Sequence, residues 1–211
     1  MMIASVLHLK RADVKALKIT DAYSLHRIVY DLFDDIRSDQ DKQKSVSSGI
    51  LYADKGGDFY GRKILMLSNR APNMPEHGEL LVKKIAASFL DHSHYRFEVV
   101  INPTKREKLQ RDGLGKKVSG KVIAIRERDQ IAQWFIDKAP QWGFEASPAH
   151  LEVGTITVKR FVKNGQVITQ GQASLLGRLT VTDPEKFIRS FQQGIGRGRA
   201  FGCGLLQIVP L

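Results

Sequence analysis

The chain has 211 residues, enough for one large domain or two small ones that each bury a hydrophobic core. Hydrophobic residues make up 42% of it, which excludes an intrinsically disordered protein. Lys and Arg (33) outnumber Asp and Glu (22), and the net charge of +11 predicts a polyanionic partner, nucleic acid before an anionic membrane. No apolar run approaches the roughly 20 residues of a membrane-spanning helix. The single cysteine fits a reducing compartment, so we expect a cytoplasmic protein.

The first half of the chain predicts a strand, a helix and two strands, followed by a weaker segment. Between residues 20 and 33 the hydrophobic side chains share one helical stripe, and Thr20 or Asp21 can cap the helix. The segment 79–90 is compatible with either a helix or a strand. The expected strands lie at residues 2–9, 45–54 and 59–68, and a polar connection joins the first of them to the helix.

The second half repeats this plan. A strand at 95–103 leads into a loop at 105–121, which is punctuated by glycine and carries at least seven cationic residues. A long β segment then turns at Asn164-Gly165, a pair that favours a type I′ hairpin. The other expected elements are helices at 127–144 and 183–195 and a final strand at 201–209.

Two halves of the β-α-β-β-α-β type predict an α+β protein with tandem ferredoxin-like domains. Each domain would be an antiparallel sheet with helices on one face, the fold of RNA-recognition modules. We expect an N-terminal domain at 1–90, which carries the first helix, and a C-terminal domain at 91–211 with a basic hairpin and a glycine-rich loop.

The glycine-rich loop "GIGRGR" lies near the end of the chain. A dinucleotide fingerprint needs its glycines between a strand and a following helix, whereas here a helix precedes and a strand follows. No Gly-Lys-Ser/Thr is present, so a P-loop is excluded as well. We expect Arg197, Gly198 and Arg199 to contact the backbone of a polynucleotide instead. The alternative is a flexible turn with solvated arginines.

One side of the first helix carries Tyr23, His26, Arg27 and Tyr30, away from the hydrophobic stripe. RNA can be cut without a metal when its 2′-OH attacks the adjacent phosphate, provided that a base and an acid move the protons. Histidine can serve in either role because its pKa lies near neutrality. Tyrosine can hydrogen-bond and orient the reacting groups. The alternative for His26 is a structural or solvated side chain.

Other candidate sites are weaker. His92 and His94 would share one face of a strand, but no Cys or carboxylate cluster completes a metal site, so we expect no metal and no other cofactor. Cys203 lies between two glycines in an apolar run and is expected to be a small buried hydrophobe.

The basic hairpin is the third feature. Lys159, Arg160 and Lys163 surround its turn, which could enter a groove or clamp phosphates. Alternatively, these charges protect an edge strand from aggregation. The Gly-aromatic octapeptide of RNA-recognition modules is not matched by "FYGRKILML", so stacking on the sheet face is not predicted.

The segments "DAYSLHRIVYDLF", "YRFEVVINPTKR" and "VTDPEKFIRSFQQGIGRGRAFGCGLL", in this order, resemble the CasE family of CRISPR repeat endoribonucleases. The resemblance implies metal-independent cleavage of precursor CRISPR RNA within the repeat stem-loop, leaving 2′,3′-cyclic phosphate and 5′-hydroxyl ends. It also implies that the enzyme retains its product and joins the other subunits of a surveillance complex.

By position, the resemblance implies His26 as the catalytic histidine, Tyr23 as its companion, and Lys105 and Arg199 as RNA contacts. Where the family often has Pro-Ala, this chain has Arg197-Gly198. The alternative is a non-catalytic RNA-binding subunit of the same fold, while a membrane-surface protein is disfavoured by the aspartates of the first helix. The expected RNA-binding set is Arg27, Lys105, Arg106, Lys159, Arg160, Lys163, Arg197, Gly198 and Arg199.

Overall fold

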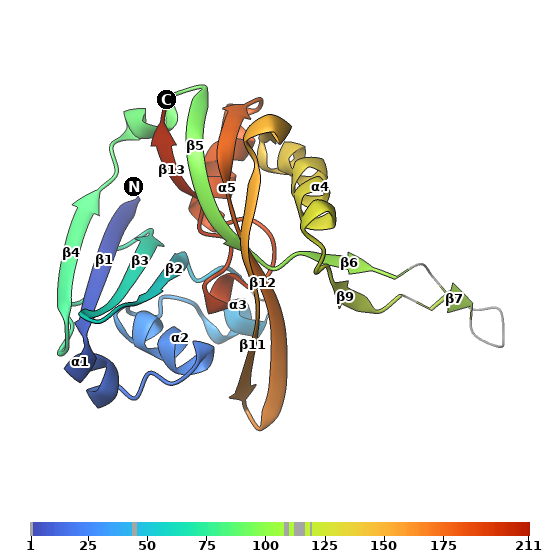
Figure 1. The fold of residues 1–211 in the computed structure, drawn as a ribbon. Helices are drawn as coiled ribbons and strands as arrows, with labels where there is room; N and C mark the ends of the chain where they lie inside the picture. Colours follow the sequence, from blue (N-terminus) through green and yellow to red (C-terminus); the bar gives the residue numbers. More distant parts are fainter. Residues whose placement is uncertain (1, 44–45, 108–109, 112–116, 119) are drawn as a thin grey trace.

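The computed structural model describes residues 2–43, 46–107, 110–111, 117–118 and 120–211. Their two large sheets are antiparallel, one from each half of the chain, with helices beside each (Figure 1). Among these residues no helix is both long and apolar enough to cross a membrane.

The N-terminal sheet has the strand order β2-β3-β1-β4, the order of a ferredoxin-like domain. Helix α2 (Ala22–Asp31) packs on one face of this sheet, because its buried Leu25 and Val29 belong to the same hydrophobic cluster as Leu7 and Ile64. The strands are β1 (Ile3–Lys10), β2 (Ile50–Gly57), β3 (Gly61–Ser68) and β4 (Glu79–Lys84), and the other helices are α1 (Arg11–Ala16) and α3 (Asp39–Gln43).

Three expectations for the first half need correction. The predicted polar connection contains the short helix α1, whose first turn is closed by Asp13 accepting a hydrogen bond from the backbone N–H of Lys10. The described segment 69–78, between β3 and β4, holds no helix, so the second helix of the expected plan is missing there. The ambiguous segment begins as strand β4, which pairs with β1, and ends as a 3-10 helix at Ala87–Leu90.

The C-terminal sheet has the order β10-β12-β5-β13, again ferredoxin-like, and β11 extends it by pairing with β12. Helices α4 (Arg128–Lys138) and α5 (Pro184–Gln193) cover one face, where Ile131, Phe135 and Phe187 are buried. The tandem ferredoxin-like fold is therefore confirmed, while the boundary after residue 90 stays a prediction. The strands are β5 (His94–Ile101), β10 (Phe144–Ala146), β11 (Glu152–Lys163), β12 (Gln166–Val181) and β13 (Gln207–Pro210); further 3-10 helices lie at Ala139–Trp142, Pro148–His150 and Arg199–Phe201.

In the second half, the start of the final strand differs from the expectation, while the β11–β12 turn agrees with it. The final strand begins at Gln207 rather than 201, because Gly202 (φ +81°) and Gly204 (φ +82°) hold the chain out of the extended conformation. At the β11–β12 turn, Asn164 (φ 50°) and Gly165 (φ 75°) both lie in the left-handed region, as a type I′ turn requires.

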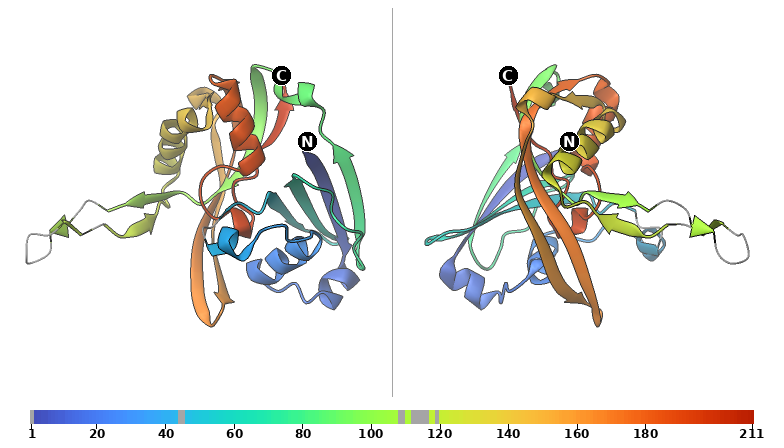
Figure 2. Two further views of the ribbon diagram at one scale, coloured as in Figure 1. Left: turned by 180° about the vertical axis from the view of Figure 1, so that it is seen from behind. Right: turned by 45° about the vertical axis from the view of Figure 1, so that its right-hand side comes forward.

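A hairpin arm leaves the C-terminal half between β5 and α4 (Figure 2). Its base is the pair β6 (Thr104–Arg106) and β9 (Val122–Ala124), and further out lies the pair β7 (Gln110–Arg111) and β8 (Lys117–Val118). The predicted basic loop thus has two short ladders, and several of its residues (108–109, 112–116 and 119) lie outside the described part of the chain.

The two halves share strand β2, whose first four residues are buried on both faces. Ile50 and Tyr52 belong to the cluster under α2, while Leu51 and Ala53 belong to the core of the C-terminal half. This packing brings the end of the long β11–β12 hairpin beside α2, although the two segments are more than a hundred residues apart in the sequence (Figure 1).

Candidate active site

Helix α2 holds Tyr23, His26 and Tyr30 half-buried beside its buried stripe. Asp21 caps the helix by accepting a hydrogen bond from the Ser24 backbone N–H at 2.7 Å, and Ser24 bonds back to the Asp21 N–H. The rings of Tyr23 and His26 are stacked, with centroids 6.1 Å apart, whereas Arg27 is exposed and directed to solvent. The structure therefore brings the two residues that were predicted to be catalytic next to each other.

The imidazole of His26 is tied to the glycine-rich loop. Its Nδ1 lies 2.7 Å from the carbonyl oxygen of Ala200. A carbonyl oxygen can only accept, so Nδ1 donates, and in the neutral ring Nε2 is the nitrogen with the free lone pair. One backbone contact thus fixes both the orientation and the tautomer of the ring.

The pKa of His26 is lowered from its ordinary value of 6.5. Burial of the half-buried ring is the largest cause; the bond to Ala200 opposes it, and the positive charge of Lys163 adds to the lowering. His26 is consequently neutral at physiological pH, the form in which an imidazole can accept a proton.

The surroundings of His26 come from three separate segments of the chain. Tyr30 on α2 has its ring centroid 4.2 Å from the imidazole, and Phe201 of the glycine-rich loop lies 5.3 Å away. Phe161 of β11 packs on Phe201 at 4.5 Å, and the ammonium of Lys163 lies over that ring at 5.8 Å. The hairpin of the C-terminal half therefore forms one wall of a site built on the N-terminal helix.

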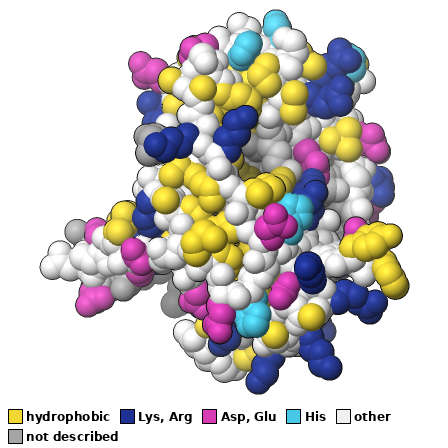
Figure 3. Space-filling view, turned by 90° about the vertical axis from the view of Figure 1, so that its left-hand side faces the viewer, with side chains coloured by type: hydrophobic (Ala, Val, Ile, Leu, Met, Phe, Trp, Pro, Cys, Tyr) yellow, Lys and Arg dark blue, Asp and Glu magenta, His cyan; other side chains and the backbone are white. Residues whose placement is uncertain are grey.

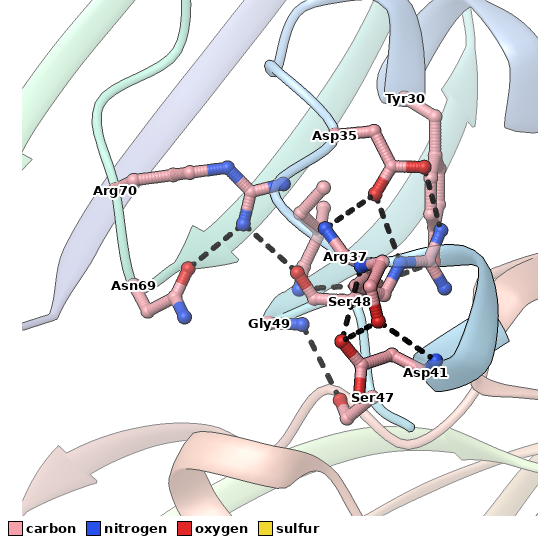
Figure 4. Close-up of polar contacts among 11 residues, drawn as sticks. Tyr30, Asp35, Arg37, Asp41, Ser47, Ser48, Gly49, Asn69 and Arg70 are labelled. Atoms are coloured by element: carbon pink, nitrogen blue, oxygen red, sulfur yellow. Dashed lines mark hydrogen bonds and ion pairs between the residues drawn. The ribbon is translucent and has the colours of Figure 1, made fainter. Parts of the chain in front are cut away.

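The far end of α2 is anchored to the start of β2 (Figure 4). The Tyr30 hydroxyl lies 3.1 Å from the Ser48 hydroxyl, and Arg70 donates to the Ser48 backbone carbonyl at 2.9 Å. Arg37, whose charge also lowers the His26 pKa, pairs with Asp35 at 3.0 Å. The Tyr30–Ser48 contact ties the end of α2 to the segment before β2, and Arg70 holds that segment in turn.

A buried polar cluster holds the carbonyl that His26 uses. The Tyr52 hydroxyl donates to the same Ala200 oxygen at 3.2 Å, and Gln172 donates to the Phe201 carbonyl at 3.1 Å. Both Gln170 and Gln172 also direct their amide N–H groups to the Cys203 sulfur, at 3.2 and 3.4 Å. These hydrogen bonds hold the backbone that contacts His26 in a fixed position.

Cys203 itself is fully buried, and burial raises the pKa of its thiol to about 12. The thiol therefore stays protonated and is no nucleophile, in agreement with the prediction of a small buried side chain. Sequence reasoning missed the roles of Tyr52 and the two glutamines. A signal was available for the glutamines, because they occupy alternate positions of a predicted strand and therefore point to the same face of it.

The glycine-rich loop is tightly packed. Gly198 has φ +79°, and a Cβ at this position would collide with the Gln170 amide. Arg199 donates to the Gln193 carbonyl at the end of α5 at 2.9 Å, so its guanidinium closes that helix. Glycines in this loop allow close packing against the buried glutamines.

The three predicted cations of the hairpin do not share one face of strand β11. Lys159 and Lys163 point to the same side of β11 as the buried Phe161, toward α2 and β2, whereas Arg160 points to solvent. The ammonium of Lys159 lies 3.8 Å from the Asp54 carboxylate. The expected clamp of three residues is therefore divided between two faces of the strand.

Three of the other predicted cations gather at a second place. Lys105, Arg106 and Arg197 line a hollow of about 560 Å³ between the base of the arm and α4. Trp134 and Trp142 form its apolar wall, with the two rings 6.1 Å apart. The glycine-rich loop joins the two places, because Arg197 reaches this hollow while Ala200 contacts His26.

The histidines that were weighed as metal ligands lie elsewhere. His94 is 3.2 Å from the Thr180 hydroxyl, and the His92 ring packs edge-on against Tyr95. In the described part of the chain, no three His, Cys, Asp or Glu side chains gather in a way that could hold a metal ion.

The comparisons with known proteins agree with this architecture. A family model described as "CRISPR associated protein" matches residues 2–210. The chain belongs to this family. The CRISPR-associated endoribonuclease Cse3 of Thermus thermophilus is 30% identical to it over 125 residues, which is 54% of this chain and 55% of that protein. The match thus spans about half the length of that relative.

Solved structures show the same fold over the whole chain. Thermus thermophilus Cse3 bound to an RNA representing a pre-cleavage complex has a TM-score of 0.76 and 20% identity, with 99% of both chains covered. A chain of a CRISPR RNA-guided surveillance complex in a pre-nicking state has a TM-score of 0.70 and 18% identity, with 100% of both chains covered.

Proposed function

We propose that this CRISPR-associated protein is a metal-independent endoribonuclease that cleaves precursor CRISPR RNA within the repeat stem-loop and retains the product. The observation that carries the proposal is the contact of His26 Nδ1 with the Ala200 carbonyl, because it leaves a neutral, oriented imidazole with Nε2 free for proton transfer. Membership of the family and the endoribonuclease name of the 30% identical relative support the same activity.

The reaction uses groups that the RNA and the site supply together. Nε2 of His26 takes the proton of the 2′-OH, the 2′-oxygen attacks the adjacent phosphorus, and the bond from phosphorus to the 5′-oxygen breaks. The departing oxygen takes up a proton, which the protonated imidazole can return. The products are a 2′,3′-cyclic phosphate and a 5′-hydroxyl. Tyr23 orients the reacting groups, and Lys163 offsets the extra negative charge on phosphorus.

The stem-loop would lie across the cations that surround this site. Arg27 and Arg160 are exposed on α2 and β11, and Lys105, Arg106 and Arg197 line the hollow beside the arm. We assign these residues to the RNA, together with Lys159, Lys163, Gly198 and Arg199 at the edge of the site. We further propose that the protein acts in the cytoplasm, where its unpaired thiol stays reduced, and joins the other subunits of a CRISPR surveillance complex.

A labelled repeat RNA tests the activity against the alternative of a binding-only subunit. We expect complete cleavage in excess EDTA, and none when the nucleotide 5′ of the scissile phosphate is 2′-deoxy. Binding of the deoxy RNA should be retained, which makes it the matched control. Cleavage of the deoxy RNA would refute attack by the 2′-OH, and binding of both RNAs without any cleavage would establish the binding-only subunit.

A further inference from the structure

The β2–β3 turn exposes two aromatic rings on the side of the N-terminal half away from His26. Phe59 is 76% exposed and Tyr60 is 82% exposed, whereas the aromatic residues of the two cores are buried. Their rings meet edge-on at 5.6 Å, and the Arg11 guanidinium lies over Phe59 at 5.7 Å. Two large apolar side chains that are exposed next to each other indicate a binding surface.

A hollow of about 770 Å³ opens beside these rings, with Tyr60 on its wall. It lies on the face of the N-terminal sheet opposite α2. Along β1, Leu7 and Leu9 point to the helix, so His8 and Lys10 point into the hollow. The side chains that line the hollow and can carry positive charge are His8, Lys10, Lys55, Arg62 and Lys63.

The positive charges of this hollow differ in their partners. Arg62 pairs with Asp54 at 2.6 Å and Lys55 with Glu98 at 2.5 Å, which ties both to the protein. Within the described residues, the side chains of Lys10 and Lys63 form no ion pair and are exposed. Lys63 stands opposite His8 across the strands, so its ammonium shares the face of the hollow.

The one acidic residue of the wall shapes the turn. The carboxylate of Asp58 accepts hydrogen bonds from the backbone N–H groups of Tyr60 (2.8 Å) and Gly61 (3.0 Å). These bonds lower the pKa of Asp58 and hold the turn that carries the two rings. Figure 3 shows protruding hydrophobic side chains next to Lys and Arg on this side of the molecule.

We propose that this hollow binds a single-stranded RNA segment that flanks the processed stem-loop, with a base stacked on Tyr60 and phosphates held by Lys10 and Lys63. Exposed rings bordered by cations suit unpaired nucleotides, because every base has a face for stacking and every linkage carries a negative charge. A protein partner is less suited, since the apolar area is confined to two rings and the cations of the wall outnumber its single carboxylate, Asp58. The rings lie at a turn, so this mode differs from stacking on the sheet face, which the sequence does not predict.

The nature of the RNA rests on the proposed function, but the site can be tested without it. The first probe is a fluorescent oligouridylate of about 8 nucleotides, and the second is the deoxy-blocked repeat stem-loop with and without such an extension. We expect Tyr60→Ala to weaken binding of the oligouridylate about tenfold and to abolish the additional affinity that the extension provides. Tyr60→Phe should retain both, because it keeps the ring. Met74→Ala, at another exposed apolar side chain (84%), is the matched control.

The outcomes separate the two proposals. Weaker binding with Tyr60→Ala and Lys63→Ala but not with Tyr60→Phe supports the site, even if the protein fails to bind or cut the repeat. Normal cleavage of the stem-loop with unchanged oligouridylate binding in both variants overturns the site and leaves the proposed function intact. Failure of Tyr60→Ala to assemble with the other subunits, without any change in RNA affinity, would also overturn it, in favour of protein docking. Since Tyr60 is exposed, equal melting temperatures are expected for all variants.

Discussion

The two cationic places joined by the glycine-rich loop use their charges differently. Beside His26, Lys159 is paired with Asp54 and Lys163 lies over the Phe201 ring, so both charges are held at fixed positions within the protein. Arg197 lines the hollow beside the arm, which is open to solvent. Fixed charges can set a pKa and stabilise a transition state, whereas exposed charges mainly attract phosphate.

We propose that the first place serves the chemistry and the second the affinity for RNA. The polar cluster of Tyr52 and Gln172 supports the assignment, because it fixes a backbone carbonyl rather than a surface. The two tryptophans of the hollow fit affinity, since they offer apolar contact area next to cations. Three variants test the division, from the largest expected effect to the smallest.

Removal of the imidazole should affect only the chemical step. We expect His26→Ala to slow single-turnover cleavage by about 10²–10⁴-fold, because the variant cannot transfer the proton in the transition state. Affinity for the stem-loop should be unchanged, since a neutral ring neutralises no phosphate. Folding should persist because Tyr52 still donates to the Ala200 carbonyl. His94→Ala, at an exposed histidine, is the control, and cleavage at the wild-type rate by His26→Ala would refute the site.

Removal of the exposed charges in the hollow should weaken RNA binding and leave the chemical step unchanged. The double variant Lys105→Ala, Arg197→Ala is expected to weaken binding, and the slope of log K against log salt should become shallower by about 0.9 for each phosphate that the variant no longer neutralises. At saturating protein the cleavage rate should return to that of the wild type. Lys186→Ala removes an exposed charge that is paired with Asp183 at the start of α5 and is the control. Unchanged affinity in the double variant would place the main RNA surface elsewhere.

A smaller effect is expected from Lys163. As a base, His26 must be neutral, so kcat/KM should be constant above the His26 pKa and fall as the pH drops through it. Because burial lowers this pKa below 6.5, activity should persist to pH values below 6.5. Lys163→Ala removes one cause of the lowering, so the midpoint should move to higher pH; Lys186→Ala should leave it in place. An unchanged midpoint would show that Lys163 does not influence the His26 pKa. Activity that falls with rising pH would show that His26 acts as the acid.

Much of the fold could be predicted from local patterns. The hydrophobic stripe and cap of α2, the Asn164-Gly165 turn and the Asp183 cap with Pro184 each specify their element through contacts within a few residues. The fourth strand of the first half was ambiguous because its apolar residues are only half covered, and pairing with β1 decides its conformation. Strand β13 starts late because glycines with positive φ precede it.

For the site, the sequence by itself determined which residues share one face of α2, since helical periodicity places Tyr23 and His26 together. Only the tertiary structure decided what His26 meets. Its hydrogen-bond acceptor, Ala200, lies 174 positions away in the chain, and Lys163 approaches only because β2 is buried between the two halves. A backbone carbonyl leaves no trace in the residue type, and the burial that lowers the pKa arises from packing between distant segments. The face of the helix is thus a local property, while the protonation state of its histidine is a property of the assembled fold.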